Sequence, residues 1–253
     1  MFSEFIKRAR VAYKSLFFGE IELDEETVEN IMAAVKEASE EEEGEQIPLA
    51  EYVGITETLG VSEHAYPIHL HEGVEEESAK EVITRIYGAI TVRNRILHYK
   101  ELYPEDPILA QVDAIPEITI MVSTYGGDAY ECMALCDAIE KAKNEGITVH
   151  TIGTGKVMSA GIAIVASGSE GCRKATKNTG FMIHDVGGYA AGLITQMEND
   201  IEESKAVRER YFGVIIENSD ITHTQVQNWI EERLNKYLTA KEARLYGIID
   251  QID

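Results

Sequence analysis

The sequence predicts an α/β fold of repeated βαβ units, preceded by an acidic and partly helical extension. From about Glu81 onward, short apolar segments alternate with helical apolar patterns, which is typical of a mainly parallel sheet covered by helices. Residues 20–51 hold thirteen acidic side chains against Lys36 alone, so they account for −12 of the formal charge of −22. We therefore predict an extension over residues 1–75 and a compact domain over residues 76–253.

Length and composition limit the function classes. The chain has 253 residues, of which 44% are apolar, so it can bury a sizeable core. Its net charge of −22 would repel a phosphate backbone, which argues against nucleic-acid binding. No apolar run approaches the roughly 18 residues that a membrane span needs. We therefore expect no membrane span. The three cysteines form no even disulfide set, which suits a reducing compartment, so we expect a cytoplasmic protein.

The extension carries two helical patterns. Residues 1–18 place apolar side chains at helical spacing with basic residues around them, which predicts an amphipathic helix. This helix either packs on the body or a neighbouring subunit, or binds a membrane surface. Asp24 is a candidate N-cap for a second helix. This helix ends in the acidic run 40–43, which is interpreted as a linker.

The elements of the compact domain follow from apolar runs and their spacing. The strand candidates are residues 82–90, 117–122, 148–153 and 180–184. The helix candidates between and after them are residues 130–144, 159–166 and 191–218.

Three segments could carry chemistry, and each follows a predicted strand. Gly126 and Gly127 form a strand-to-helix turn that lets the backbone approach a ligand and exposes amide N–H groups. Ser159 starts a small-residue helix, where the free N–H of Ala160 lies beside its hydroxyl, as a nucleophile with an oxyanion hole requires. His184 ends a strand, and a neutral imidazole there could accept the serine proton. Taken singly, each has an ordinary structural interpretation: a tight turn, an N-cap and a core histidine.

No metal site is predicted. His64, His69 and His71 are close in sequence but lack an acidic or cysteine partner in a recognised pattern. Cys132 and Cys136 lie four apart on a predicted helix and are interpreted as small buried side chains.

The three segments, in this order, resemble the proteolytic subunit of the Clp protease, ClpP. The pair Gly126-Gly127 matches the family's Ser-Pro-Gly-Gly turn, Ser159 matches the serine of Ala-Ser-Met-Gly, and residues 182–184 match Met-Ile-His. The interval of 25 residues between serine and histidine is kept. Residues 237–243 and 246–250 look like the family's Phe-Met-Ser-Ala-x-Glu-Ala and Tyr-Gly-Leu-Ile-Asp, so the resemblance covers about residues 83–253.

This resemblance implies a Ser-His-Asn triad. It makes Ser159 the nucleophile, His184 the general base, and the N–H groups of Gly127 and Ala160 the oxyanion donors. The family's third member is an aspartate, and that position here is Asn235. An amide can orient an imidazole but brings no charge to stabilise imidazolium, so we expect reduced activity.

The resemblance also implies an assembly. It implies a crotonase-like fold with residues 191–218 as a protruding handle helix, and a homo-oligomer of heptameric rings stacked as a tetradecamer. Peptides or unfolded proteins would be the substrates and an AAA+ unfoldase the partner. No cofactor is expected in this chain, with ATP acting only through the unfoldase. Two alternatives stay open: a catalytically weak or inactive ring subunit with a structural or regulatory role, and a crotonase-fold enzyme acting on an acyl thioester.

Overall fold

The computed structural model describes residues 67–105, 115, 117–232 and 235–253. Contacts divide the chain into two units, of which one, the sheet unit, comprises residues 66–91 and 115–253. Of the other unit, the described part is residues 92–105. The two helices and the linker predicted for the acidic extension lie outside the described residues.

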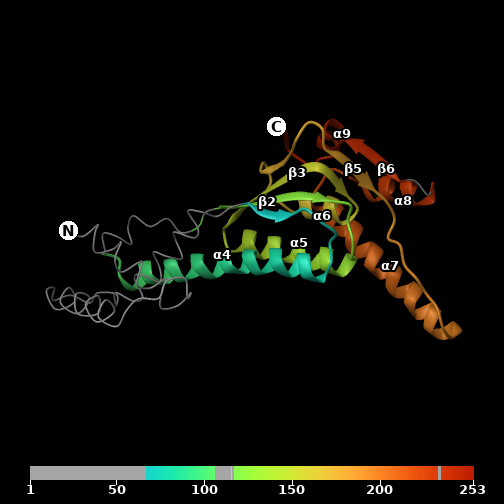
Figure 1. The fold of residues 1–253 in the computed structure, drawn as a ribbon, viewed down its shortest axis with the longest axis horizontal. Coiled ribbons are helices and arrows are strands. Elements are labelled where there is room, and N and C mark those ends of the chain that lie inside the picture. The colour runs from blue at the N-terminus through green and yellow to red at the C-terminus, as the bar shows by residue number, and fades with distance from the viewer. Residues whose placement is uncertain (1–66, 106–114, 116, 233–234) are drawn as a thin grey trace, which may run out of the picture. The chain divides into compact units, whose positions relative to one another are not determined.

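The sheet is parallel apart from one strand pair (Figure 1). Five parallel strands lie in the hydrogen-bonded order β1 (Ile68–Leu70), β2 (Glu117–Thr124), β3 (Thr148–Met158), β4 (Arg173–Ala175) and β7 (Gln251–Ile252). Two more strands extend it, because β5 (Gly180–Ile183) pairs in parallel with β3 and β6 (Lys236–Thr239) pairs in antiparallel with β5.

The long strand β3 is shared between two neighbours on the same side. Residues Thr151, Ile152 and Gly153 pair with β4, whereas its last three residues pair with β5. The change of partner coincides with Gly155, whose φ of 65° is a conformation that favours glycine. The C-terminal ends of β3 and β5 therefore lie side by side, with Met158 opposite Met182.

Helices cover the sheet and complete the core. They are α4 (Glu76–Leu102), α5 (Ala129–Asn144), α6 (Ala160–Ala166), α7 (Ile194–Glu217), α8 (His223–Glu231) and α9 (Ala240–Leu245). Every residue of α6 is buried, whereas α7 buries only four residues of its C-terminal half, Val207, Tyr211, Phe212 and Ile215. The N-terminal half of α7 extends away from the sheet (Figure 1). No helix in the described part of the chain is long and apolar enough to cross a bilayer.

The predicted α/β fold with a parallel sheet and a handle helix is confirmed, and most elements match. The strands predicted at 117–122, 148–153 and 180–184 are present, and the helix predicted at 191–218 is α7. The strand prediction for residues 82–90 is wrong, because this segment is the interior of α4. Its β-branched composition suggested a strand, but Val82, Ile86 and Ile90 recur every four residues and form one buried face.

The described chain before α4 also contributes a strand. Residues 67–75 belong to the sheet unit, and β1 pairs with β2 through Ile68, His69 and Leu70. The sequence did not predict β1, because a three-residue strand with a central histidine gives almost no periodic signal.

Candidate active site

Ser159 occupies a strained turn between β3 and α6. Its φ is 52° and its ψ is −122°, and among the described residues it is the one non-glycine residue with positive φ. Such a conformation costs of order 1–3 kcal/mol and persists where neighbours impose it. Here Ser159 N–H donates to the carbonyl of Met182 at 2.8 Å, and the hydroxyl of Tyr211 donates to the carbonyl of Ser159 at 3.0 Å. The backbone of the serine is thus held by β5 on one side and α7 on the other.

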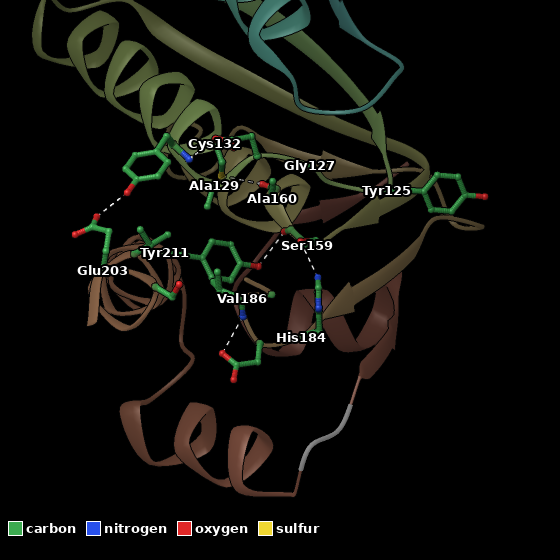
Figure 2. Close-up of a pocket in the computed structure, with 16 residues that line it drawn as sticks. Tyr125, Gly127, Ala129, Cys132, Ser159, Ala160, His184, Val186, Glu203 and Tyr211 are labelled. Carbon is green, nitrogen blue, oxygen red and sulfur yellow. Dashed lines mark hydrogen bonds between the residues drawn. The ribbon is translucent and has the colours of Figure 1, made fainter. Parts of the chain in front are cut away.

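His184 lies one residue beyond β5 and reaches the hydroxyl of Ser159. The distance from His184 Nε2 to Ser159 Oγ is 2.8 Å, within hydrogen-bond range (Figure 2). The two residues are brought together because β3 and β5 pair in parallel, with Met158, one residue before Ser159, opposite Met182, two residues before His184. This arrangement of nucleophile and base is the one that acyl transfer by a serine requires.

Two backbone N–H groups lie beside this pair. Val74 and Gly127 form an isolated parallel β-bridge. In it, Val74 N–H donates to Gly126 O at 3.0 Å, and Val74 O accepts from Asp128 N at 2.7 Å. The N–H of Gly127 therefore points away from Val74. The N–H of Ala160 is at the start of α6, where amides have no partner inside the helix. Gly127, Ala160, Ser159 and His184 line one pocket (Figure 2).

This pocket has a volume of about 540 Å³ and opens beside Ser159. Apolar groups of Ala129, Cys132, Val207 and Tyr211 form much of its lining. Burial, with the nearby thiols of Cys132 and Cys136, raises the pKa of Tyr211 well above its ordinary value, so the phenol stays a hydrogen-bond donor.

Cys132 and Cys136 are buried, as predicted, whereas Cys172 is half-buried. Cys132 Sγ donates to the carbonyl of Ala160 at 3.4 Å. Its hydrogen bond with Cys136, together with burial, raises the pKa of Cys132 well above its ordinary value, so the thiol stays protonated. In the described part of the chain no three His, Cys, Asp or Glu side chains gather as a metal would require.

Asn235 does not join the other predicted site residues in this structure. It is exposed, just before β6, and among the described residues no hydrogen bond links it to His184. Asp185 lines the pocket, but its Oδ1 accepts from Val186 N at 2.8 Å and its Oδ2 lies 3.7 Å from an Arg208 nitrogen.

The contributions of α7 to the site are not predicted by the sequence. Tyr211 fits the apolar face of a helix and Glu203 fits its polar face, so neither stands out as a site residue. Their contacts lie 52 and 73 residues away in sequence, on Ser159 and Tyr130, and no local pattern marks such partners.

Comparison with known proteins finds a matching family and several similar chains. The model of the family described as Clp protease matches residues 80–253. An "ATP-dependent Clp protease proteolytic subunit" of Bacteroides thetaiotaomicron is 28% identical over 144 residues, which are 57% of this chain and 63% of that protein. A protein of the same name from Bacteroides fragilis is 27% identical over 144 residues, 57% of this chain and 67% of that protein. An "ATP-dependent Clp protease proteolytic subunit 2" of Corynebacterium jeikeium is 28% identical over 146 residues, 57% of this chain and 68% of that protein. The chain thus spans less than two thirds of the length of the Bacteroides thetaiotaomicron relative.

Proposed function

Since this chain belongs to the Clp protease family, we propose that it is a serine endopeptidase that cleaves unfolded polypeptides through an acyl-enzyme. The observation that carries this proposal is the 2.8 Å contact of His184 Nε2 with Ser159 Oγ, beside two available backbone N–H groups.

The proposed reaction uses Ser159 as nucleophile and His184 as general base. Neutral His184 takes the hydroxyl proton while Oγ attacks the carbonyl carbon of the substrate. The carbonyl oxygen becomes an oxyanion, which accepts hydrogen bonds from the N–H groups of Gly127 and Ala160. His184 then gives its proton to the leaving amine, and a water activated in the same way hydrolyses the acyl-enzyme.

Asn235 is proposed as the third member of the triad on the family resemblance. A neutral amide there would accept a hydrogen bond from the second ring N–H of His184 without adding charge, so the catalytic rate would be reduced relative to an aspartate.

Assembly and partner are proposed from the relatives and from α7. The relatives' names describe subunits of an ATP-dependent protease, which supports an oligomer and an ATP-driven partner. Heptameric rings stacked as a tetradecamer, and an AAA+ unfoldase as that partner, are proposed on the family resemblance. The exposed apolar side chains of Leu193, Ile194 and Ile201 give α7 a surface that an assembly would bury. The chain itself would need no cofactor.

Labelling with a fluorophosphonate, together with cleavage of a fluorogenic peptide, tests the proposed activity. Wild type should be labelled at Ser159 and should cleave the peptide. Ser159→Ala should abolish both, and His184→Ala should reduce both by orders of magnitude, because the pair acts as a unit. Ser219→Ala, a change at a serine that bonds to Ile215 O outside the pocket, is the matched control and should match wild type. A wild-type protein that is neither labelled nor active would favour the alternative of an inactive ring subunit.

A further inference from the structure

Helices α5 and α7 are joined by three side chains, which we call the α5–α7 bridge: Tyr130, Glu203 and Arg210. The hydroxyl of Tyr130 donates to Glu203 Oε1 at 2.6 Å, and Arg210 donates to the same oxygen at 2.5 Å. The guanidinium of Arg210 lies over the ring of Tyr130, 5.6 Å from its centroid. Each member contacts the other two, so the bridge is a closed triangle of half-exposed side chains that spans the two helices.

The bridge lies at the end of the pocket that holds Ser159. Tyr130 and Glu203 both line this pocket. Figure 2 shows Glu203 on α7 at one side and His184 at the other, with Tyr211 and Val186 between them. The apolar lining of Cys132, Val207 and Tyr211 therefore runs from the reactive pair towards the bridge.

The first turn of α5 holds Tyr130 of the bridge close in sequence to Gly127, one of the two oxyanion donors. Asp128 follows Gly127 directly and caps α5, because its carboxylate accepts from the N–H groups of Tyr130 and Glu131. Tyr130 is thus held three residues from Gly127, on a capped first turn. A side chain of a substrate whose carbonyl oxygen is held by Gly127 and Ala160 would point into the space that the bridge closes.

The charged side chains that line this space are carboxylates, while Arg210 and Arg208, which pair with Glu203 and Asp185, lie outside the lining. Glu203 stays ionised, since hydrogen bonds from Tyr130 and Arg210 lower the pKa of its carboxyl group below the ordinary value. Asp128 and Asp185 are the other carboxylates of the lining, and no Lys or Arg is found among the described residues that line the pocket. An acidic substrate side chain would therefore enter without a lining cation to pair with.

We propose that the α5–α7 bridge is the end wall of the substrate pocket and determines which side chain precedes the cleaved bond. The hydrogen bond of Tyr130 with Glu203 limits the length of the pocket, so medium apolar side chains are accepted and large aromatic ones are disfavoured. The carboxylate of Glu203 rejects acidic side chains. This inference rests on the proposed peptidase activity and assigns the specificity of that same site.

The test compares kcat/KM for three fluorogenic peptides that differ only in the residue before the cleaved bond: Leu, Trp or Glu. Tyr130→Phe keeps the ring but removes the hydrogen bond, so it should raise the Trp-to-Leu ratio by about fivefold or more. Glu203→Gln is nearly isosteric and still accepts from Tyr130, so it should raise the Glu-to-Leu ratio by about fivefold or more with a smaller change for Trp.

Two matched controls separate these effects from unspecific changes. Tyr87→Phe removes a hydroxyl from an exposed tyrosine on α4, and Glu198→Gln removes a charge from an exposed position on α7. Both should keep the wild-type ratios. Thermal denaturation of all four variants checks folding. If Tyr130→Phe is unstable, the Glu-to-Leu ratio of the near-isosteric Glu203→Gln still tests the role of the bridge.

The outcomes distinguish the two proposals. If wild type is labelled at Ser159 and cleaves the Leu peptide, but both bridge variants keep its ratios, the bridge does not determine specificity. If wild type is neither labelled nor active, the peptidase activity itself is wrong, and the role of the bridge as a substrate wall is overturned with it.

Discussion

Gly126 is packed directly against Ser159. A Cβ atom at Gly126 would lie 2.5 Å from Ser159 Cβ and 2.9 Å from its Oγ, closer than real Cβ atoms approach. The φ of Gly126 is 102°, a value that L side chains rarely adopt. The turn before α5 can therefore lie beside the serine only because this residue has no side chain.

The substitution Gly126→Ala should abolish fluorophosphonate labelling of Ser159 and lower the free energy of unfolding by about 1–3 kcal/mol, since it adds both a clash and backbone strain. Gly88→Ala is the matched control, because a Cβ there meets nothing within 4 Å and the residue lies in α4. That control should retain labelling and gain up to about 1 kcal/mol of stability. Labelling and urea denaturation of both variants provide the check, and normal labelling of Gly126→Ala would contradict the close packing.

Tyr211→Phe should lower kcat several-fold while KM changes little, because the lost hydrogen bond holds the carbonyl of Ser159 and not the substrate. The pKa of Tyr211 is raised well above its ordinary value, chiefly by burial, so the phenol stays neutral throughout the assay range. The ratio of wild-type to variant kcat should therefore be constant from about pH 6 to pH 9. Tyr189→Phe, at a residue that is 90% exposed, is the control. A ratio that falls towards one as pH rises would show that Tyr211 ionises.

Asp250→Asn should destabilise the fold through its pair with Arg173. The carboxylate accepts from Arg173 N–H, Nε and Nη2 at 2.9, 3.0 and 2.6 Å, so the change should cost about 1–3 kcal/mol near neutral pH. Burial by itself would raise the pKa of Asp250, but the hydrogen bonds from the side chain and backbone of Arg173 outweigh it and lower the pKa.

The folded-state pKa of Asp250 lies below its unfolded value of about 3.9. The contribution of the ionised carboxylate to the free energy of unfolding is therefore complete above about pH 4 and is lost as pH falls through the folded-state pKa. The stability difference between wild type and Asp250→Asn should thus be constant from about pH 7 to pH 5 and shrink below about pH 4. Urea denaturation over this range measures it. Asp253→Asn, which removes a more exposed partner 3.7 Å from Lys174, should have little effect at any pH.

Asn235→Asp should raise kcat for a short peptide and leave KM roughly unchanged, because a carboxylate beside His184 would favour imidazolium in the transition state. Asn235→Ala should lower kcat if the amide orients the ring. Steady-state cleavage by wild type and both variants measures this. Equal kcat in all three proteins would remove Asn235 from the proposed triad and leave Ser159 and His184 as a dyad.

Assembly should depend on the exposed face of α7. Ile194 and Ile201 are 70% and 48% exposed, so wild type should scatter light as a particle many times heavier than its chain mass of 28.2 kDa. The double substitution Ile194→Glu and Ile201→Glu should yield a much smaller particle, whereas Glu198→Gln should not. A monomeric wild type at micromolar concentration would contradict the proposed rings.

Much of the fold follows from local patterns. The alternation of apolar segments with helical patterns predicted the parallel sheet, and the glycine pair, Ser159 and His184 were found because each directly follows a predicted strand. The failure at residues 82–90 has a local cause too, since β-branched residues favour strands and their spacing of four was given too little weight.

By itself, the sequence determined the central strands β2, β3 and β5, the helices α5, α6 and α7, and which residues could react, because periodicity and turn residues act over a few neighbours. Only the tertiary structure decided which of these residues meet. The parallel pairing of β3 with β5 places His184 against Ser159, whereas Asn235 remains exposed near the same strands. The contact of Tyr130 with Glu203 spans 73 residues and exists because α5 and α7 pack together. Such contacts depend on how elements bury their apolar faces against one another, which is a property of the whole chain.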